Sequence, residues 1–190
     1  MKKHQSQSQG GFSAIETLVA VSIIMIVMAI ALIRWTTLLP NARANAAMDM
    51  VVYRLRSARE DAIAHRRLVQ VQFVGTNQIT ISEIWLAGTP PAPQTYTFED
   101  NTVFMTLAGV PDTPMGFGNS SAIYFEGVSG GPPTMTFNTT GAFVDGSNNY
   151  VNGTVFLGIA GDTNSARAIT VLGATGRVRE YHWNGSAWQE

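Results

Sequence analysis

The stretch FSAIETLVAVSIIMIVMAIALI, residues 12–33, contains 22 residues and one charge, Glu16. As an α-helix it would measure roughly 33 Å, about the thickness of the hydrocarbon core of a bilayer. Arg34 and Trp35 follow it, and a charge and an amphipathic ring suit the membrane interface. The stretch therefore predicts a membrane-spanning helix near the N-terminus.

The residues before this stretch, MKKHQSQSQGG, are short, polar and basic. An ordinary secretory signal has its small-residue cleavage site after the apolar region, whereas the pair Gly10-Gly11 stands before it. Cleavage after Gly11 would leave the apolar helix on the mature chain, with a free amine on Phe12. Glu16 would lie about one helical turn from that amine, which suits pairing with the terminus of a neighbouring subunit. An uncleaved anchor or an ordinary signal peptide is the alternative, but neither explains the Gly-Phe junction or the lone glutamate.

Together, Gly11-Phe12, Glu16 and the unbroken apolar run resemble the leader of type IV pilins and type II secretion pseudopilins. The resemblance implies that a prepilin peptidase cuts after Gly11 and methylates the new terminus at Phe12, and that Glu16 is the carboxylate used in filament assembly. The implied partners are this peptidase, other pilin or pseudopilin subunits, and the assembly platform of the inner membrane. The implied location is the bacterial inner membrane, in one pass, with a periplasmic globular domain, and then a periplasmic pseudopilus or a surface pilus.

Many members of the family have proline at the position of Ile33, and this sequence departs from them there. The first proline of the chain is Pro40, where we expect the bend instead, and a second helical pattern follows it. Asn41 is placed to cap this second half. Within residues 41–67, apolar side chains recur at helical spacing and predict one buried face, formed by Ala47, Met48, Val51, Val52, Leu55, Ala58 and Ala62. We therefore expect a leader at 1–11, a membrane or filament-core helix at 12–40, and a globular domain at 41–190 that begins with the amphipathic helix 41–67.

After residue 67 the apolar period changes to two, which indicates strands, and stretches rich in Gly, Pro and Asn separate them. The predicted strands cover residues 68–74, 78–85, 96–99, 103–107, 122–126, 134–138, 154–160, 167–172 and 177–183. No alternation of strand and helix is seen. The predicted fold class is α+β, with a long N-terminal hydrophobic helix packed on a C-terminal antiparallel β-sheet or sandwich at 68–190.

The order of these elements, with RAITVLGATGRVR at 167–179 near the end, resembles the GspH/FimT branch of the family. Its members are minor pseudopilins of type II secretion or minor pilins of type IV pilus systems. The function this implies is a structural subunit that contributes to protein secretion. The alternative is a FimT-like minor pilin that binds DNA for natural transformation.

If the chain binds DNA, four residues near the C-terminus are the candidates for that binding. Arg177, Arg179, Tyr181 and Trp183 alternate along one strand, so they would share a face on which guanidiniums grip phosphates and aromatic rings stack on bases. Without residues 1–11, ten arginines face thirteen acids, a net charge of −3, which does not favour a general nucleic-acid binder. The simpler interpretation is a terminal hairpin whose arginines pair with acids and whose aromatics cover the edge of the core.

The sequence offers no enzymatic site, and we expect neither catalytic residues nor a cofactor. Cysteine is absent. The run GVSGG at 127–131 matches the G-x-S-x-G pattern of hydrolases, but Pro132-Pro133 forbid the helix that this chemistry needs. A tethered enzyme that uses Ser129 is therefore a remote third hypothesis.

No metal site is predicted either. The oxygen-rich segments at 145–149 and 161–164 each supply only one carboxylate, which is few for a Ca²⁺ site. The preference of Asp, Asn and Gly for turns explains these segments more simply, and Ca²⁺ binding is the alternative. His4, His65 and His182 have no spacing typical of zinc.

Overall fold

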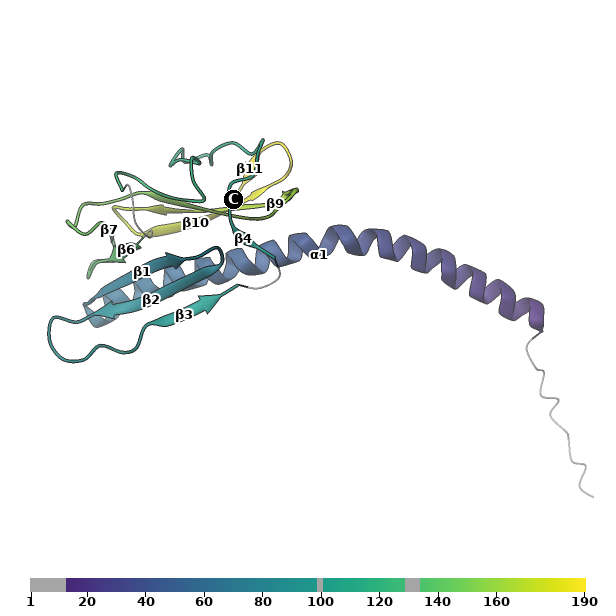
Figure 1. Cartoon of the computed structure of the whole chain (residues 1–190), viewed down its shortest axis with the longest axis horizontal. Helices are drawn as coiled ribbons and strands as arrows, with labels where there is room; N and C mark the ends of the chain where they lie inside the picture. The colour runs from purple at the N-terminus through teal and green to yellow at the C-terminus, as the bar shows by residue number, and fades with distance from the viewer. Residues whose placement is uncertain (1–12, 99–100, 129–133) are drawn as a thin grey trace, which may run out of the picture. The chain divides into compact units, whose positions relative to one another are not determined.

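The computed structural model describes residues 13–98, 101–128 and 134–190, without the side chains of residues 33–37. The predicted cleavage junction Gly11-Phe12 lies outside these residues. The described chain forms one helix, α1 (Ala14–His65), followed by eleven strands (Figure 1). It divides into two compact units, Met1–Leu39 and Pro40–Glu190, which are described separately below.

Helix α1 includes Pro40 in its interior, so no new helix begins at Asn41. The expected cap at Asn41 is therefore wrong. A proline removes one backbone hydrogen bond, and packing of the residues that follow keeps the helix intact. The Asn41 side chain instead accepts a hydrogen bond of 3.3 Å from Nη2 of Arg167.

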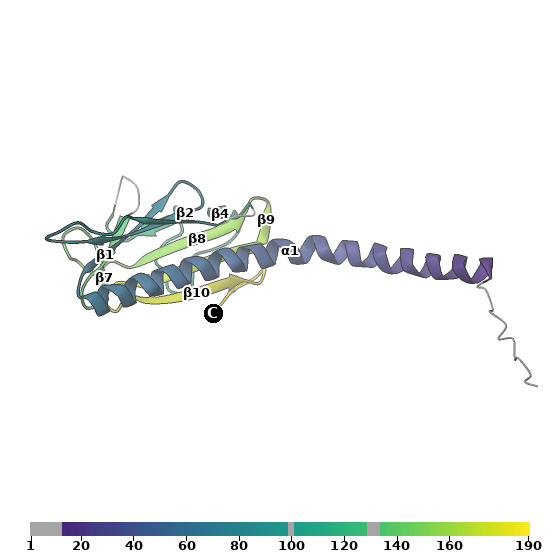
Figure 2. The same cartoon turned by 90° about the horizontal axis from the view of Figure 1, so that it is seen from below.

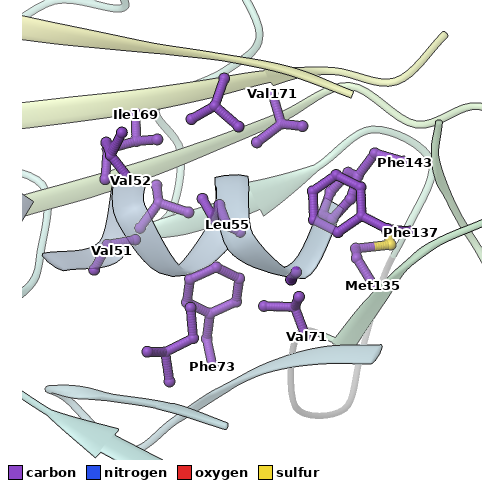
Figure 3. Close-up of a cluster of buried hydrophobic side chains, with 14 of the residues drawn as sticks. Val51, Val52, Leu55, Val71, Phe73, Met135, Phe137, Phe143, Ile169 and Val171 are labelled. Carbon is purple, nitrogen blue, oxygen red and sulfur yellow. The ribbon is translucent and has the colours of Figure 1, made fainter. Parts of the chain in front are cut away.

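The C-terminal half of α1 supplies one wall of the domain core. The seven apolar positions that the helical period predicted as buried are 0–3% exposed, which confirms this face: Ala47, Met48, Val51, Val52, Leu55, Ala58 and Ala62. Figure 3 shows Val51, Val52 and Leu55 among side chains from both sheets of the domain. Burial of this face, more than intrinsic propensity, holds a helix of this kind in place.

Two antiparallel sheets complete the domain and confirm the α+β class. The first has the order β3-β2-β1-β6-β7, with bounds β3 (Gln94–Thr97), β2 (Gln78–Ile84), β1 (Leu68–Val74), β6 (Thr134–Phe137) and β7 (Phe143–Val144). The second has the order β11-β10-β9-β8-β4, and β5 also pairs with β8. Its bounds are β11 (Trp188–Gln189), β10 (Arg177–Trp183), β9 (Asp162–Leu172), β8 (Gly153–Ile159), β4 (Val103–Phe104) and β5 (Ile123–Phe125).

The inner faces of both sheets pack on the C-terminal half of α1. Val71 and Phe73 come from the first sheet, and Ile169 and Val171 come from the second (Figure 3). Figure 2 shows this half of the helix running along β8 and β10. One core thus joins the helix to every long strand of the domain.

Candidate functional site

The first turn of α1 explains how Glu16 is held. The backbone N–H of Ser13 donates to Oε2 of Glu16 over 3.2 Å, and the N–H of Ile15 donates to Oγ of Ser13 over 3.4 Å. The carbonyl of Ser13 accepts the first helical hydrogen bond, from Thr17. Ser13 is therefore the N-cap, and Ser-x-x-Glu at 13–16 forms a capping box. The capping box gives Glu16 a local role in its own helix, beside the predicted role in assembly. The Ser-x-x-Glu motif that signals it was visible in the sequence.

The helix after this cap is apolar on every side. Residues Ala14–Leu32 have a mean hydropathy of 2.6 and none of them is buried within the chain. This is the one described helix that is long and apolar enough to cross a membrane, judged by length and composition. Two polar side chains inside it are satisfied locally, since Thr17 Oγ1 donates to the Ala14 carbonyl (2.9 Å) and Ser22 Oγ donates to the Leu18 carbonyl (2.8 Å). So many exposed apolar side chains need lipid or protein around them.

Strand β10 carries the four residues predicted for DNA binding, and both of its faces are partly covered, since Val178 is buried on one face and Tyr181 and Trp183 are buried on the other. The two aromatic side chains are almost fully buried, with exposures of 2% for Tyr181 and 8% for Trp183. Tyr181 packs with Phe156, Met115 and Trp188, and the ring of Trp188 lies 5.5 Å from that of Trp183. In this structure neither ring is open to a base. Tyr181 belongs to a small second hydrophobic cluster with Phe156 and Ala168, and Trp183 contacts it through Trp188.

The two arginines of β10 differ in their surroundings. Arg179 pairs with Glu190 over 3.3 Å and lies against the sulfur of Met115. Arg177 is exposed and lines a groove of about 450 Å³ together with Arg56 and Arg59 of α1. This grouping of helix and hairpin arginines was not predicted, because residues 56–59 and 177 are far apart in the sequence.

Glycine at position 176 makes this grouping possible. Gly176 has a φ of +62°, and a Cβ added to it would lie 1.9 Å from the carbonyl oxygen of Gly141. The β9–β10 turn can therefore lie this close to the Gly141 carbonyl, beside the Arg59 side chain, only without a side chain at residue 176. Nε of Arg59 then donates to the carbonyls of Gly141 (3.2 Å) and Thr175 (3.1 Å), which fixes the turn to the helix.

A buried arginine in β9 was missed by the sequence analysis. Arg167 is 4% exposed, and its guanidinium donates to Asn45 Oδ1 (2.7 Å), to the carbonyls of Asn164 and Ala166 (2.8 Å each), and to Asn41 Oδ1 (3.3 Å). The signal in the sequence was the pair Asn41 and Asn45, which stand one turn apart on the helix. The arginine therefore ties the start of the domain's helix to the second sheet.

Burial also shapes the charges of this cluster. It lowers the pKa of Arg167, and the charge of Asp162 partly opposes this shift. Burial, and next the charge of Arg167, lower the pKa of the neighbouring His182, while Glu180 and Asp49 act in the opposite direction. Arginine stays charged at any physiological pH, so the cluster holds one permanent cation among neutral acceptors.

In both oxygen-rich turns, the Asp carboxylate accepts hydrogen bonds from backbone N–H groups of the same turn. The Asn149 side chain donates to Oδ2 of Asp145, and the N–H groups of Asn149 and Ser147 donate to its Oδ1. These three hydrogen bonds lower the pKa of Asp145, that from the Asn149 side chain the most. Asp162 accepts the N–H of Asn164 over 3.0 Å. Among the described residues, no group of three or more His, Cys, Asp or Glu side chains is placed to hold a metal ion. Of the G-x-S-x-G run, residues 129–131 lie outside the described part.

Comparisons with known proteins give structural similarity only. No protein-family model matches the chain, and no curated protein matches its sequence significantly. The minor type IV pilin FimU of Pseudomonas aeruginosa strain PAO1 aligns at 15% identity over 77% of this chain and 92% of that chain, with a TM-score of 0.49. The minor pseudopilin EpsH of the type 2 secretion system of Vibrio cholerae aligns at 14% identity over 74% of this chain and 97% of that chain, also with a TM-score of 0.49.

Proposed function

We propose that this chain is a minor pilin or pseudopilin, a structural subunit of a type IV pilus or type II secretion filament, and that it contributes to protein secretion. One observation carries the proposal: a single helix, α1, is apolar and uncovered at Ala14–Leu32 and forms the core of a β domain further along. The first half needs an apolar environment that the chain does not supply. The second half belongs to a folded domain, so one chain supplies both an apolar helix for the filament core and a domain for its surface.

Prepilin peptidase cuts after Gly11 and methylates Phe12, in agreement with the leader that the sequence resembles. The apolar helix then holds the subunit in the inner membrane as a single span, with the domain in the periplasm, until the assembly platform adds it to a filament. No residue breaks a bond in this function, and no cofactor takes part. Membership of the GspH/FimT branch belongs to the same proposal.

Glu16 serves both its own helix and the neighbouring subunit. Its Oε2 accepts the N–H of Ser13, and no other described residue donates a hydrogen bond to its side chain. In the proposed filament, Oε1 receives the amine of Phe12 of an adjacent subunit. A carboxylate inside an apolar assembly is costly unless it is paired, so this contact favours one axial register between helices.

The intact mass of the protein from its native membrane tests the proposal. The expected mass begins at methylated Phe12 and includes the apolar helix. Gly11→Val should block the cleavage, whereas Gly10→Ala, its matched control, should leave it unchanged. A mass that retains Met1, or one that lacks the apolar helix, contradicts the proposal.

A second candidate function, DNA binding, is favoured by the groove between Arg56, Arg59 and Arg177. Only phosphate contacts are open to it, because Tyr181 and Trp183 are buried. For a DNA receptor, changing Arg177 and Arg179 to alanine should weaken DNA retention and reduce its dependence on salt by about one unit of slope per lost phosphate contact. If the variant retains DNA as well as the wild type does, DNA binding is excluded and the secretion role alone remains.

A further inference from the structure

The end of α1 and the start of the β2–β3 loop enclose a pocket that the filament function does not use. Its volume is about 350 Å³, within the range of sites for small ligands. The lining side chains include Arg66, Arg67, Leu68, Ile84, Trp85 and Leu86. Figure 1 shows the β2–β3 loop beside the last turn of α1.

Backbone strain marks Arg66 as unusual. The helix ends in a Schellman motif, in which the N–H of Arg67 donates to the Ala62 carbonyl (3.1 Å) and that of Arg66 to the Ile63 carbonyl (3.4 Å). This motif places residue 66 in the left-handed region, with φ +50°. Glycine is the usual residue there because it has no Cβ to strain. An arginine at this position departs from the preference for glycine in a left-handed conformation, and such departures are expected where a side chain has a function.

The charges around the pocket leave the Arg66 guanidinium uncompensated. Glu83 is already engaged by Arg67 (3.6 Å), by His65 (3.8 Å) and by the indole N–H of Trp85 (2.8 Å). Arg66 is exposed and makes no ion pair or side-chain hydrogen bond with any described residue. The pocket therefore presents a free cation in a chain whose net charge is negative.

The apolar part of the pocket is organised and open. The guanidinium of Arg67 lies 3.8 Å from the centre of the Trp85 ring, which holds the indole in place from one side. Leu86 is fully exposed, and Ile84 is one of the other large apolar side chains left open to solvent. Neighbouring exposed apolar side chains next to a cation are typical of a surface that binds another molecule.

We propose that this pocket binds a peptide segment of a partner protein in which a carboxylate side chain stands between apolar side chains. Arg66 receives the carboxylate, and the apolar side chains contact Trp85, Leu86 and Ile84. Charge complementarity selects this occupant: the free group is a guanidinium, which pairs with carboxylates in two-pronged geometry. The proposal goes beyond the filament function and does not rest on it, since it concerns the domain surface alone.

The test uses the full chain in lipid nanodiscs, labelled with 5-fluorotryptophan, and fluorine NMR. The probe is a pentapeptide with leucine on both sides of a central glutamate. The peptide should shift the Trp85 signal in a saturable manner and leave the signals of Trp183 and Trp188 unchanged. Replacing the glutamate of the peptide by glutamine, or its leucines by serine, should weaken binding at least tenfold.

Arg66→Gly is the decisive variant, because it removes the guanidinium and suits the backbone. It should keep the domain folded and weaken binding of the peptide at least tenfold. Asn148→Gly is the matched control, since Asn148 also has a positive φ of 63° but lies outside the pocket, and binding should not change.

The proposal would be overturned by no shift of the Trp85 signal, by equal binding of the glutamine peptide, or by unchanged affinity in Arg66→Gly. A Trp85 signal that moves with protein concentration in the absence of peptide would assign the pocket to a second copy of this chain, and would also overturn it.

Discussion

The two halves of α1 differ both in their apolar content and in their environment. In the first, Ala14–Leu32, apolar side chains point in all directions and none is buried. In the second, they recur on one face and are buried in the domain, as at Val51 and Leu55. The environments follow from these sequences, since a helix that is apolar all round needs an apolar surrounding, whereas a helix that is apolar on one face needs only one partner surface.

This difference divides the roles of the helix. The buried half decides whether the domain folds, because its side chains belong to the same core as both sheets. The exposed half contributes nothing to that core. Substitutions in the two halves should therefore have separable effects, on domain stability in one and on membrane insertion or assembly in the other.

The strongest test of the difference between the two halves places an aspartate in each of them. Val51→Asp puts an unpaired carboxylate where the side chain is 0% exposed, and its cost of several kcal/mol should leave the domain unfolded. Val27→Asp, at a side chain 60% exposed, should leave the thermal unfolding of the domain unchanged. Its carboxylate should instead reduce membrane insertion by about 2.5–3.5 kcal/mol. Thermal melts by circular dichroism and membrane fractionation check the pair, and a folded domain in Val51→Asp would contradict it.

The next largest effect is expected at Arg167, whose hydrogen bonds join the second sheet to α1. Arg167→Met fills similar space but leaves Asn41, Asn45 and two carbonyls without their donor, so the free energy of unfolding should fall by about 2–3 kcal/mol. The pKa of His182 should rise, because the charge of Arg167 helps to lower it. Chemical denaturation and NMR titration measure the two effects. Arg177→Ala, at an exposed arginine, should change stability by less than about 0.5 kcal/mol, and equal losses in both variants would contradict the role of burial.

Patterns with a clear period were predictable from the sequence. The seven helix positions that the 3.6-residue period predicted as buried are buried, although Ala44, which is also buried, was not among them. The bounds of β1 and β10 match the predicted strands 68–74 and 177–183. The two-residue strands β7 and β11 were missed, because two residues carry no period. The predicted strand 103–107 ends at Phe104 in β4, after which Met105 keeps one backbone bond to Phe156.

The candidate sites were less predictable, because they depend on contacts between distant segments. Alternation correctly placed Tyr181 and Trp183 on one face with Arg179, but it could not show that Met115 and Trp188 cover that face. The burial of Arg167 has the same origin, since its acceptors come from both α1 and β9. A local period tells which side chains share a face, and only the fold tells what lies on it.

Two substitutions at Glu16 separate capping from assembly. Glu16→Ala removes both roles and should weaken the start of α1 by about 0.5–1 kcal/mol. Glu16→Gln keeps an acceptor for the N–H of Ser13, so the start of the helix should hold, whereas the amine of Phe12 loses its charged partner. Hydrogen exchange at residues 14–18 reports the cap, and incorporation into filaments reports assembly. If Glu16→Gln assembled like the wild type, capping alone would account for the glutamate.

The smallest expected effect is a gain of stability at the end of α1. Arg66→Gly removes a Cβ from a left-handed backbone position, and we expect the domain to become more stable by about 0.5–1 kcal/mol. Asn148→Gly should gain less, because asparagine tolerates this conformation better than arginine. Thermal melts of both variants beside the wild type measure the difference. A lower melting temperature for Arg66→Gly would mean that the arginine stabilises the domain through its packing. A higher melting temperature would show that the arginine destabilises the domain, so that stability does not explain its presence at the pocket.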